Sequence, residues 1–101
     1  AKAPLTARIE VEVESREQVE EALAAGADII MLDNMAVDEM VQMAALVDGR
    51  ALVEASGGIT KDKIAAVAAA GVDFISVGAI THSSRALDVA LDLEISEGAA
   101  G

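Results

Sequence analysis

With 101 residues, of which 53% are apolar, the chain is long enough for one small domain with a packed core. A net charge of −11 excludes nucleic acid and anionic membranes as partners, because both require clustered basic groups. The single aromatic residue, Phe74, excludes binding by stacking on bases. The lack of cysteine excludes disulfides and thiolate chemistry. Since no apolar run approaches the roughly 20 residues that span a bilayer, we expect a cytoplasmic protein.

Short apolar runs suited to strands recur at a spacing of about twenty residues. Four strands are predicted, namely Arg8 to Glu14, Asp28 to Asp33, Arg50 to Ala55 and Asp73 to Val77. Because amphipathic segments separate them, the order indicates βα units and a parallel sheet. The sequence therefore predicts an α/β fold.

Three helices are predicted between these strands, and each ends close to a glycine. The first begins at Ser15, the first residue of a capping box, and stops at Gly26. The second covers Val37 to Val47. The third is capped by Thr60 and ends at Gly71.

Two of the units share a sequence pattern, since Ala25 to Ile30 matches Ala70 to Ile75. Repeated βα units favour a barrel or a part of one. Four such units form about half of a TIM-like barrel, which leaves two strand edges and an apolar face open. We therefore expect the chain to form a homo-oligomer, with a dimer as the first choice.

The last part of the chain alternates apolar and polar residues from Leu87 to Ile95. Strict alternation predicts a further C-terminal strand, and a helix beginning at Ser84 is the second interpretation. The predicted strand has no host sheet, so it is a candidate for pairing between chains. Glu97 to Gly101 is predicted to be a flexible tail.

Acidic residues on the first predicted strand mark a candidate site. Side chains alternate across a strand, so Glu10, Glu12 and Glu14 share one face. In a barrel that face would line the lumen. The alternative is a solvated edge strand that carries charge.

The second predicted strand ends in Asp33-Asn34. Active sites of barrels collect at the C-terminal ends of the strands, which makes Asp33 a candidate site residue. Alternatively, Asp33 only caps the next helix.

Glycine turns follow the third and fourth predicted strands. Ser56, Gly57 and Gly58 precede a helix, where exposed backbone N–H groups can bind a phosphate. Gly78 allows close backbone approach at the next strand end, a usual place for phosphate in such folds. The alternative is tight turns that need glycine for their backbone angles, and His82 by itself is more typical of a capping or packing residue.

Four strings occur together in register: Ile9 to Glu14, Ile29 to Met35, Glu54 to Thr60 and Gly71 to Ser83. In this order and at these spacings the chain resembles the quinolinate phosphoribosyltransferase family, also called the carboxylating nicotinate-nucleotide pyrophosphorylases. The resemblance covers nearly the whole chain.

The resemblance implies transfer of the phosphoribosyl group of phosphoribosyl pyrophosphate to the nitrogen of quinolinate, with Mg²⁺ and loss of carbon dioxide. The product is nicotinate mononucleotide for NAD synthesis. Glu12 and Asp33 match the catalytic carboxylates beside the ribose and the metal-bound pyrophosphate, and Glu10 and Glu14 would support them. The positions that match the ribose-phosphate site are Ser56, Gly57, Gly58, Gly78 and His82.

The family also has an N-terminal α/β sandwich domain and earlier barrel strands whose basic residues bind quinolinate, and these 101 residues contain neither. Residues 1–101 are therefore expected to be a C-terminal barrel segment that carries only the phosphoribose side of the site. The alternatives are an inactive, excised or engineered half-barrel that oligomerises, another phosphate-binding barrel enzyme, or a family member with a different acceptor.

Overall fold

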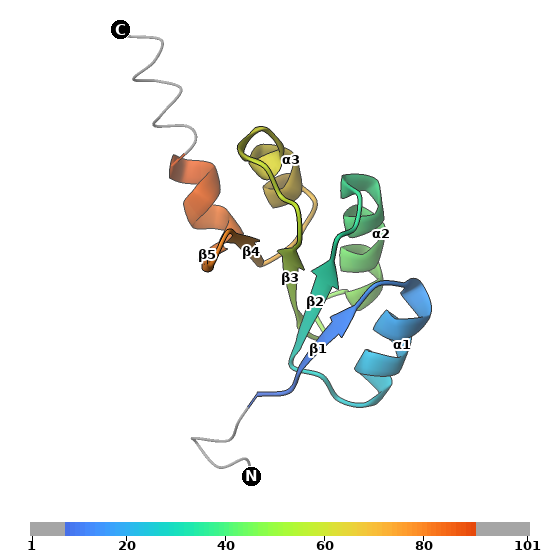
Figure 1. The fold of residues 1–101 in the computed structure, drawn as a ribbon. Coiled ribbons are helices and arrows are strands. Elements are labelled where there is room, and N and C mark those ends of the chain that lie inside the picture. Colours follow the sequence, from blue (N-terminus) through green and yellow to red (C-terminus); the bar gives the residue numbers. More distant parts are fainter. Residues whose placement is uncertain (1–7, 91–101) are drawn as a thin grey trace, which may run out of the picture.

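The computed structural model describes residues 8–90 (Figure 1). In chain order its elements are β1 (Glu10–Val13), α1 (Arg16–Ala24), β2 (Ile29–Asp33), α2 (Val37–Val47), β3 (Leu52–Ser56), η1 (Lys61–Lys63), α3 (Ile64–Ala69), β4 (Phe74–Val77) and β5 (Ile80–Ser83). A further helix covers residues 84–90. The predicted α/β class and the four predicted strands are confirmed.

The strands form one sheet in the order β1-β2-β3-β4-β5. The first four are parallel, and β5 runs antiparallel to β4. α1, α2 and α3 connect the parallel strands and lie on the same side of the sheet (Figure 1). One face of the sheet is therefore packed against helices, and the other face is available for polar side chains.

The core lies between the sheet and these helices and is built from aliphatic side chains. Strand residues of one face and the inward residues of α1, α2 and α3 are all buried, including Val13, Ile30, Leu32, Ile75, Val19, Met40, Val47 and Val67. Burial of aliphatic side chains is the main favourable term in folding. This packing holds the strand ends, and so the candidate site, in a fixed arrangement.

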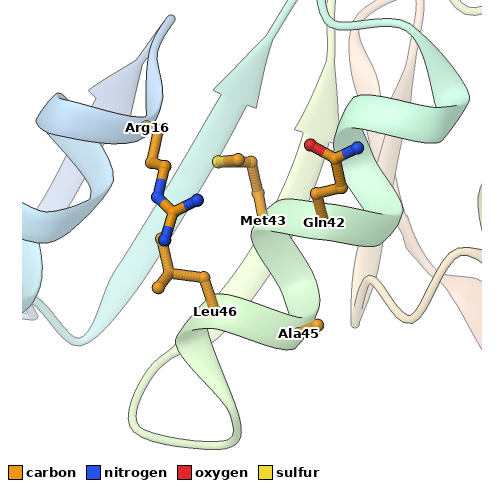
Figure 2. Close-up of a pocket in the computed structure, with 5 residues that line it drawn as sticks. All are labelled: Arg16, Gln42, Met43, Ala45 and Leu46. Carbon is orange, nitrogen blue, oxygen red and sulfur yellow. The ribbon is translucent and has the colours of Figure 1, made fainter.

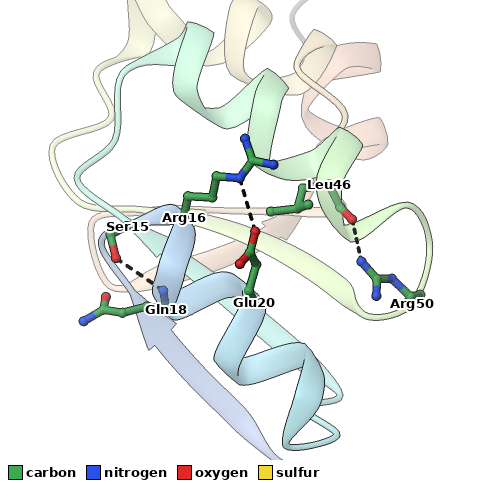
Figure 3. A network of polar contacts seen from close by, with 6 residues as sticks. All are labelled: Ser15, Arg16, Gln18, Glu20, Leu46 and Arg50. Atoms are coloured by element: carbon green, nitrogen blue, oxygen red, sulfur yellow. Dashed lines mark hydrogen bonds and ion pairs between the residues drawn. The ribbon is translucent and has the colours of Figure 1, made fainter.

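Local hydrogen bonds explain where α1 begins and where α2 ends (Figure 3). The Ser15 hydroxyl accepts a bond from the Gln18 N–H at 3.3 Å, which confirms the predicted cap. At the end of α2, the Arg50 guanidinium donates to the Leu46 carbonyl at 2.8 Å. Because Arg50 satisfies a helix-end carbonyl, the strand begins at Leu52 rather than at Arg50 as predicted.

The third predicted helix has a different start from the one expected. A 3₁₀ turn, η1, precedes α3, and the Thr60 side chain makes no capping bond to the backbone. Its hydroxyl donates instead to the Asp62 carboxylate at 2.5 Å, which lowers the pKa of Asp62. The predicted side-chain cap by Thr60 was therefore wrong, because a nearby carboxylate competes for the hydroxyl.

The predicted C-terminal strand was also wrong over residues 87–90, since residues 84–90 are helical, and the second interpretation, a helix beginning at Ser84, is confirmed. The Ser83 hydroxyl accepts a bond from the Ala86 N–H at 3.1 Å and so caps this helix. Leu87 packs against the core, and alanine and leucine favour helices. The short strand β5, which was not predicted, occupies the preceding residues, and residues 91–95 of the predicted strand and the predicted tail lie outside the described residues.

The repeated Ala-Gly-X-Asp pattern has the same structural role in both copies. The Asp28 carboxylate accepts a bond from the Ile9 N–H at 2.8 Å, and the Asp73 carboxylate accepts one from the Val53 N–H at 2.8 Å. Each aspartate thus holds the backbone of the neighbouring strand at the point where its own strand begins.

We expect Asp73→Ala to lower the free energy of unfolding by about 1–2 kcal/mol, because a part-buried N–H loses its acceptor. Asp73→Asn keeps an acceptor oxygen and should cost clearly less. Urea denaturation of the two variants measures the difference. Equal losses would show that the hydrogen bond to Val53 does not stabilise the strand.

Within residues 8–90, none of the helices is both long enough and apolar enough to cross a bilayer.

Candidate functional site

The face of the sheet opposite the helices carries the acidic residues. The pairing register aligns Glu12 with Met31, Met31 with Glu54, and Glu54 with Phe74, so these side chains share one face. Asp33 pairs with Ser56 two residues further along these strands, and so on the same face. The C-terminal ends of three parallel strands therefore bring carboxylates from separate parts of the sequence together.

The carboxyl groups of Glu12 and Asp33 face each other and form a hydrogen bond when Glu12 is protonated. This bond, followed by the negative charge of Asp33, raises the pKa of Glu12 above the ordinary 4.5. Partial desolvation and the charge of Glu14 act in the same direction. The pair can therefore hold one proton between two carboxyls, or accept hydrogen bonds and a cation when both are ionised.

Gly57 lies directly against this pair. A Cβ atom built on Gly57 would be 2.8 Å from Asp33 Oδ1 and 3.0 Å from the Asn34 backbone nitrogen. Its φ of +85° is also one that side-chain-bearing residues rarely adopt. Glycine is thus required here for both space and backbone angle, and the turn after β3 touches the Asp33 carboxylate.

Backbone contacts connect the same two strand ends. The Asn34 N–H donates to the Ser56 carbonyl at 2.9 Å, and Asn34 has a φ of +56°. Its side-chain oxygen would lie 3.5 Å from a Cβ built on Gly58. The structure therefore brings together five of the predicted site residues, which are Glu12, Asp33, Ser56, Gly57 and Gly58.

Asp33 does not cap the helix that follows it. The residue at the N-cap of α2 is Ala36, and its N–H donates to the Glu39 carboxylate at 3.2 Å. The alternative interpretation of Asp33 as a helix cap was therefore wrong, and its carboxylate faces Glu12 and Gly57 instead.

The remaining predicted site residues take other positions. Gly78, with a φ of +62°, forms the turn between β4 and β5, and a Cβ there would meet nothing within 4 Å. His82 pairs with Ile75, whose side chain belongs to the helix-covered core, so His82 is on the face opposite Glu12. Glu10 is exposed on β1, and Glu14 lies just beyond that strand.

Four polar residues beside the site were not singled out from the sequence. Asn34 contacts the glycine turn, and Glu54, Ser76 and Thr81 are linked by hydrogen bonds on the acidic face. These residues could have been found from the alternation of side chains along each strand, which places every second residue on the same face. Glu54 is two residues before Ser56 and Ser76 is two before Gly78, so each shares a face with its strand end.

A pocket of about 390 Å³ lies elsewhere, between α1 and α2 (Figure 2). It is lined by Arg16, Gln42, Met43, Ala45 and Leu46. None of the predicted site residues contributes to it, and these helices cover the face of the sheet opposite the carboxylates (Figure 1). The pocket is therefore separate from the candidate site.

Replacing Asp33 with asparagine is expected to bring the pKa of Glu12 down toward 4.5, because the largest raising causes, the hydrogen bond and the negative charge of Asp33, are both removed. Carbon-detected NMR titration of the Glu12 carboxyl measures this change. An unaltered pKa of Glu12 in the variant would contradict the pairing.

The same pair has a consequence for stability. A raised pKa means that the folded chain keeps a proton that the unfolded chain releases, so this stabilisation is present below pH 4.5 and is lost as the pH rises through the raised value. Asp33→Asn should remove this pH dependence.

Comparisons with known proteins identify the family of the chain. The family model described as quinolinate phosphoribosyl transferase, C-terminal domain, matches residues 1–92. The "probable nicotinate-nucleotide pyrophosphorylase [carboxylating]" of Bacillus subtilis is 47% identical over 88 residues, and the corresponding protein of Mycobacterium leprae is 45% identical over 87. These matches cover 87% and 83% of the chain but only 30% and 31% of the relatives.

Solved structures give the same result. The nicotinate-nucleotide pyrophosphorylase of Francisella tularensis superposes with a TM-score of 0.66 at 45% sequence identity, covering 73% of this chain and 27% of that one. The chain therefore spans about a third or less of the proteins that it matches. By sequence and by fold it belongs to the family of quinolinate phosphoribosyl transferase C-terminal domains.

Proposed function

We propose that this chain forms the phosphoribose side of an active site that transfers a phosphoribosyl group from phosphoribosyl pyrophosphate to quinolinate. Carbon dioxide is released, and nicotinate mononucleotide is formed for NAD synthesis. The observation that carries the proposal is the position of Asp33, which bonds to Glu12 on one side and touches the Gly57 turn on the other. A carboxylate group and a phosphate-binding turn are thus adjacent, as a ribose phosphate requires.

In this proposal Glu12 and Asp33 bind the ribose. Carboxylates accept hydrogen bonds from ribose hydroxyls, and their negative charge stabilises the positive charge that develops at the anomeric carbon as pyrophosphate leaves. The raised pKa of Glu12 means that substrate binding also moves a proton, because bonds from ribose hydroxyls favour the ionised form.

The glycine turns bind the phosphate. Gly57 and Gly58 both have positive φ, and because glycine has no side chain, nothing of their own shields their backbone N–H groups. We assign Ser56, Gly57 and Gly58 to the phosphate, together with Gly78. His82 reaches this group only if β5 is rearranged relative to β4, because its present register places it on the opposite face.

Mg²⁺ fits the carboxylate pair. Within residues 8–90 there is no cluster of three or more acidic or histidine side chains that could hold a metal ion alone. Mg²⁺ is often held by one or two carboxylates together with substrate phosphates, and Glu12 and Asp33 can supply that number. When bound, the ion would neutralise charge on the departing pyrophosphate.

We further propose that the chain is part of an α/β barrel, about half of one. Four parallel strands with their helices on one side support this, since barrels are built from such units. The open edge of β1 favours completion by another chain or segment, with a homodimer as the first choice. In the relatives, the groups that bind quinolinate would lie outside the matched region, and a cytoplasmic location fits this metabolism.

Calorimetric titration of the chain with phosphoribosyl pyrophosphate and Mg²⁺ tests the proposal. We expect binding that is lost in Asp33→Ala and kept in Glu21→Ala, a matched loss of one carboxylate on α1. A folded chain that binds no ligand at millimolar concentration would contradict the proposal. Equal loss in both variants would show that general charge, not the site, controls binding.

A further inference from the structure

Glu54 is a buried charged residue on the acidic face. Within residues 8–90 its exposed fraction is 7%, whereas Glu12 and Glu10 on the same face are exposed. Burying a carboxylate is unfavourable unless hydrogen bonds replace the water that it loses. The partners of Glu54 therefore indicate what this residue does.

A chain of hydrogen bonds leads away from Glu54 across two strands. The Ser76 hydroxyl donates to Glu54 Oε2 at 2.8 Å, and the hydroxyls of Ser76 and Thr81 are 2.7 Å apart. A hydroxyl has one proton to donate. Because Ser76 donates its proton to Glu54, its oxygen is left to accept the proton of Thr81, and these two bonds join β3, β4 and β5.

These side-chain hydrogen bonds lie where the backbone pairing between β3 and β4 stops. The pairing of β2 with β3 continues to Asp33 and Ser56, at the end of both strands. Among the described strands, β3 pairs with β4 only at Glu54 with Phe74 and Ala55 with Ile75. Beyond that level, the diagonal hydrogen bond from Ser76 to Glu54 links the two strands.

Both glycine turns begin just past this level. Gly57 and Gly58 follow β3, and Gly78 follows β4. The separation of the two turns therefore depends on how the ends of β3 and β4 are held, and a side-chain bond replaces the missing backbone ladder there.

We propose that Glu54 is a positioning residue that acts through Ser76 and Thr81 to set the distance between the two glycine turns, so that both can contact one phosphate. The role in phosphate binding rests on the proposed function above. The role in holding the turns does not, because it concerns the chain without ligand.

Two measurements on the 101-residue chain test the proposal. The first is hydrogen exchange, without ligand, of the backbone amides paired beside the two turns, which are Asn34 against Ser56 and Ile80 against Val77. We expect Ser76→Ala to speed exchange at both turns by about tenfold, since one part-buried hydrogen bond is lost. The second is the affinity for phosphoribosyl pyrophosphate with Mg²⁺, which should weaken by about tenfold in the same variant.

Conservative variants separate positioning from charge. Glu54→Gln keeps an oxygen that can accept from Ser76 and should stay within about threefold of the unchanged chain in both measurements. Glu54→Met removes the acceptor and should behave like Ser76→Ala. Ser83→Ala is the matched control, because it deletes another hydroxyl of β5 whose bond is to Ala86 instead.

The outcomes are distinguishable. Faster exchange at both turns in Ser76→Ala, with Ser83→Ala unchanged, supports the positioning role even if the parent chain binds no ligand, a result that would contradict the proposed function alone. Exchange at the turns that is the same in Ser76→Ala, Glu54→Met and the parent chain would overturn the positioning role. If Glu54→Gln behaves like Glu54→Met, the negative charge rather than the hydrogen bond matters, which also overturns it.

Discussion

Replacing Gly57 with alanine is expected to abolish measurable binding of phosphoribosyl pyrophosphate. The added methyl group would lie 2.8 Å from Asp33 Oδ1 and 3.0 Å from the Asn34 nitrogen, so the carboxylate and the turn must move apart. The φ of +85° adds backbone strain of roughly 1–3 kcal/mol. Both effects act on the contact between the two halves of the proposed site, and calorimetric titration measures the loss.

Gly26 provides the matched control for this substitution. Its φ of +82° is nearly the same, but a Cβ there meets nothing within 4 Å. Gly26→Ala should therefore show a similar backbone cost in urea denaturation while binding stays unchanged. If Gly57→Ala binds as well as Gly26→Ala, the turn after β3 does not contact the phosphoribose group.

Leu32→Ala is expected to cost about 2–5 kcal/mol of unfolding free energy, which is enough to unfold much of a small domain. Leu32 is fully buried at the centre of the sheet, between its partners Val13 and Ala55. The substitution leaves a cavity directly beneath Asp33, so residual folded protein should also bind phosphoribosyl pyrophosphate more weakly. Urea denaturation followed by circular dichroism measures the stability.

Leu52 on the neighbouring strand is the control, because its side chain is 37% exposed and lies on the opposite face. Leu52→Ala should cost less than about 1 kcal/mol in the isolated chain. Comparable losses for the two leucines would show that the open face is also covered, as it would be in a dimer. Repeating the measurement over a range of protein concentration identifies that case.

The fold could be predicted to the extent that local patterns determine it. Apolar runs separated by glycine-ended helices located all four parallel strands, because the face of each strand that packs against the helices requires apolar side chains. The end of the chain could not be predicted in this way. Alternation from Leu87 indicated a strand, but the Ser83 cap and the packing of Leu87 stabilise a helix there, and a cap is a weaker signal than a repeat.

The site was predictable where it depends on strand ends and glycine. Asp33 and Gly57 follow adjacent strands, and parallel strands bring their ends together, so their proximity follows from the fold. The shared hydrogen bond of Glu12 and Asp33 depends on register, which the sequence specifies only indirectly. The face on which His82 lies depends on β5, a strand too short to be recognised from its pattern.

The most direct test of a single phosphoribose site is an NMR titration of the isotope-labelled chain with phosphoribosyl pyrophosphate and Mg²⁺. We predict that the amides of Gly57, Gly58 and Gly78 and the carboxyls of Glu12 and Asp33 shift together with one dissociation constant. Shifts confined to the lysines of η1, or different constants for the carboxyls and the glycine turns, would contradict it.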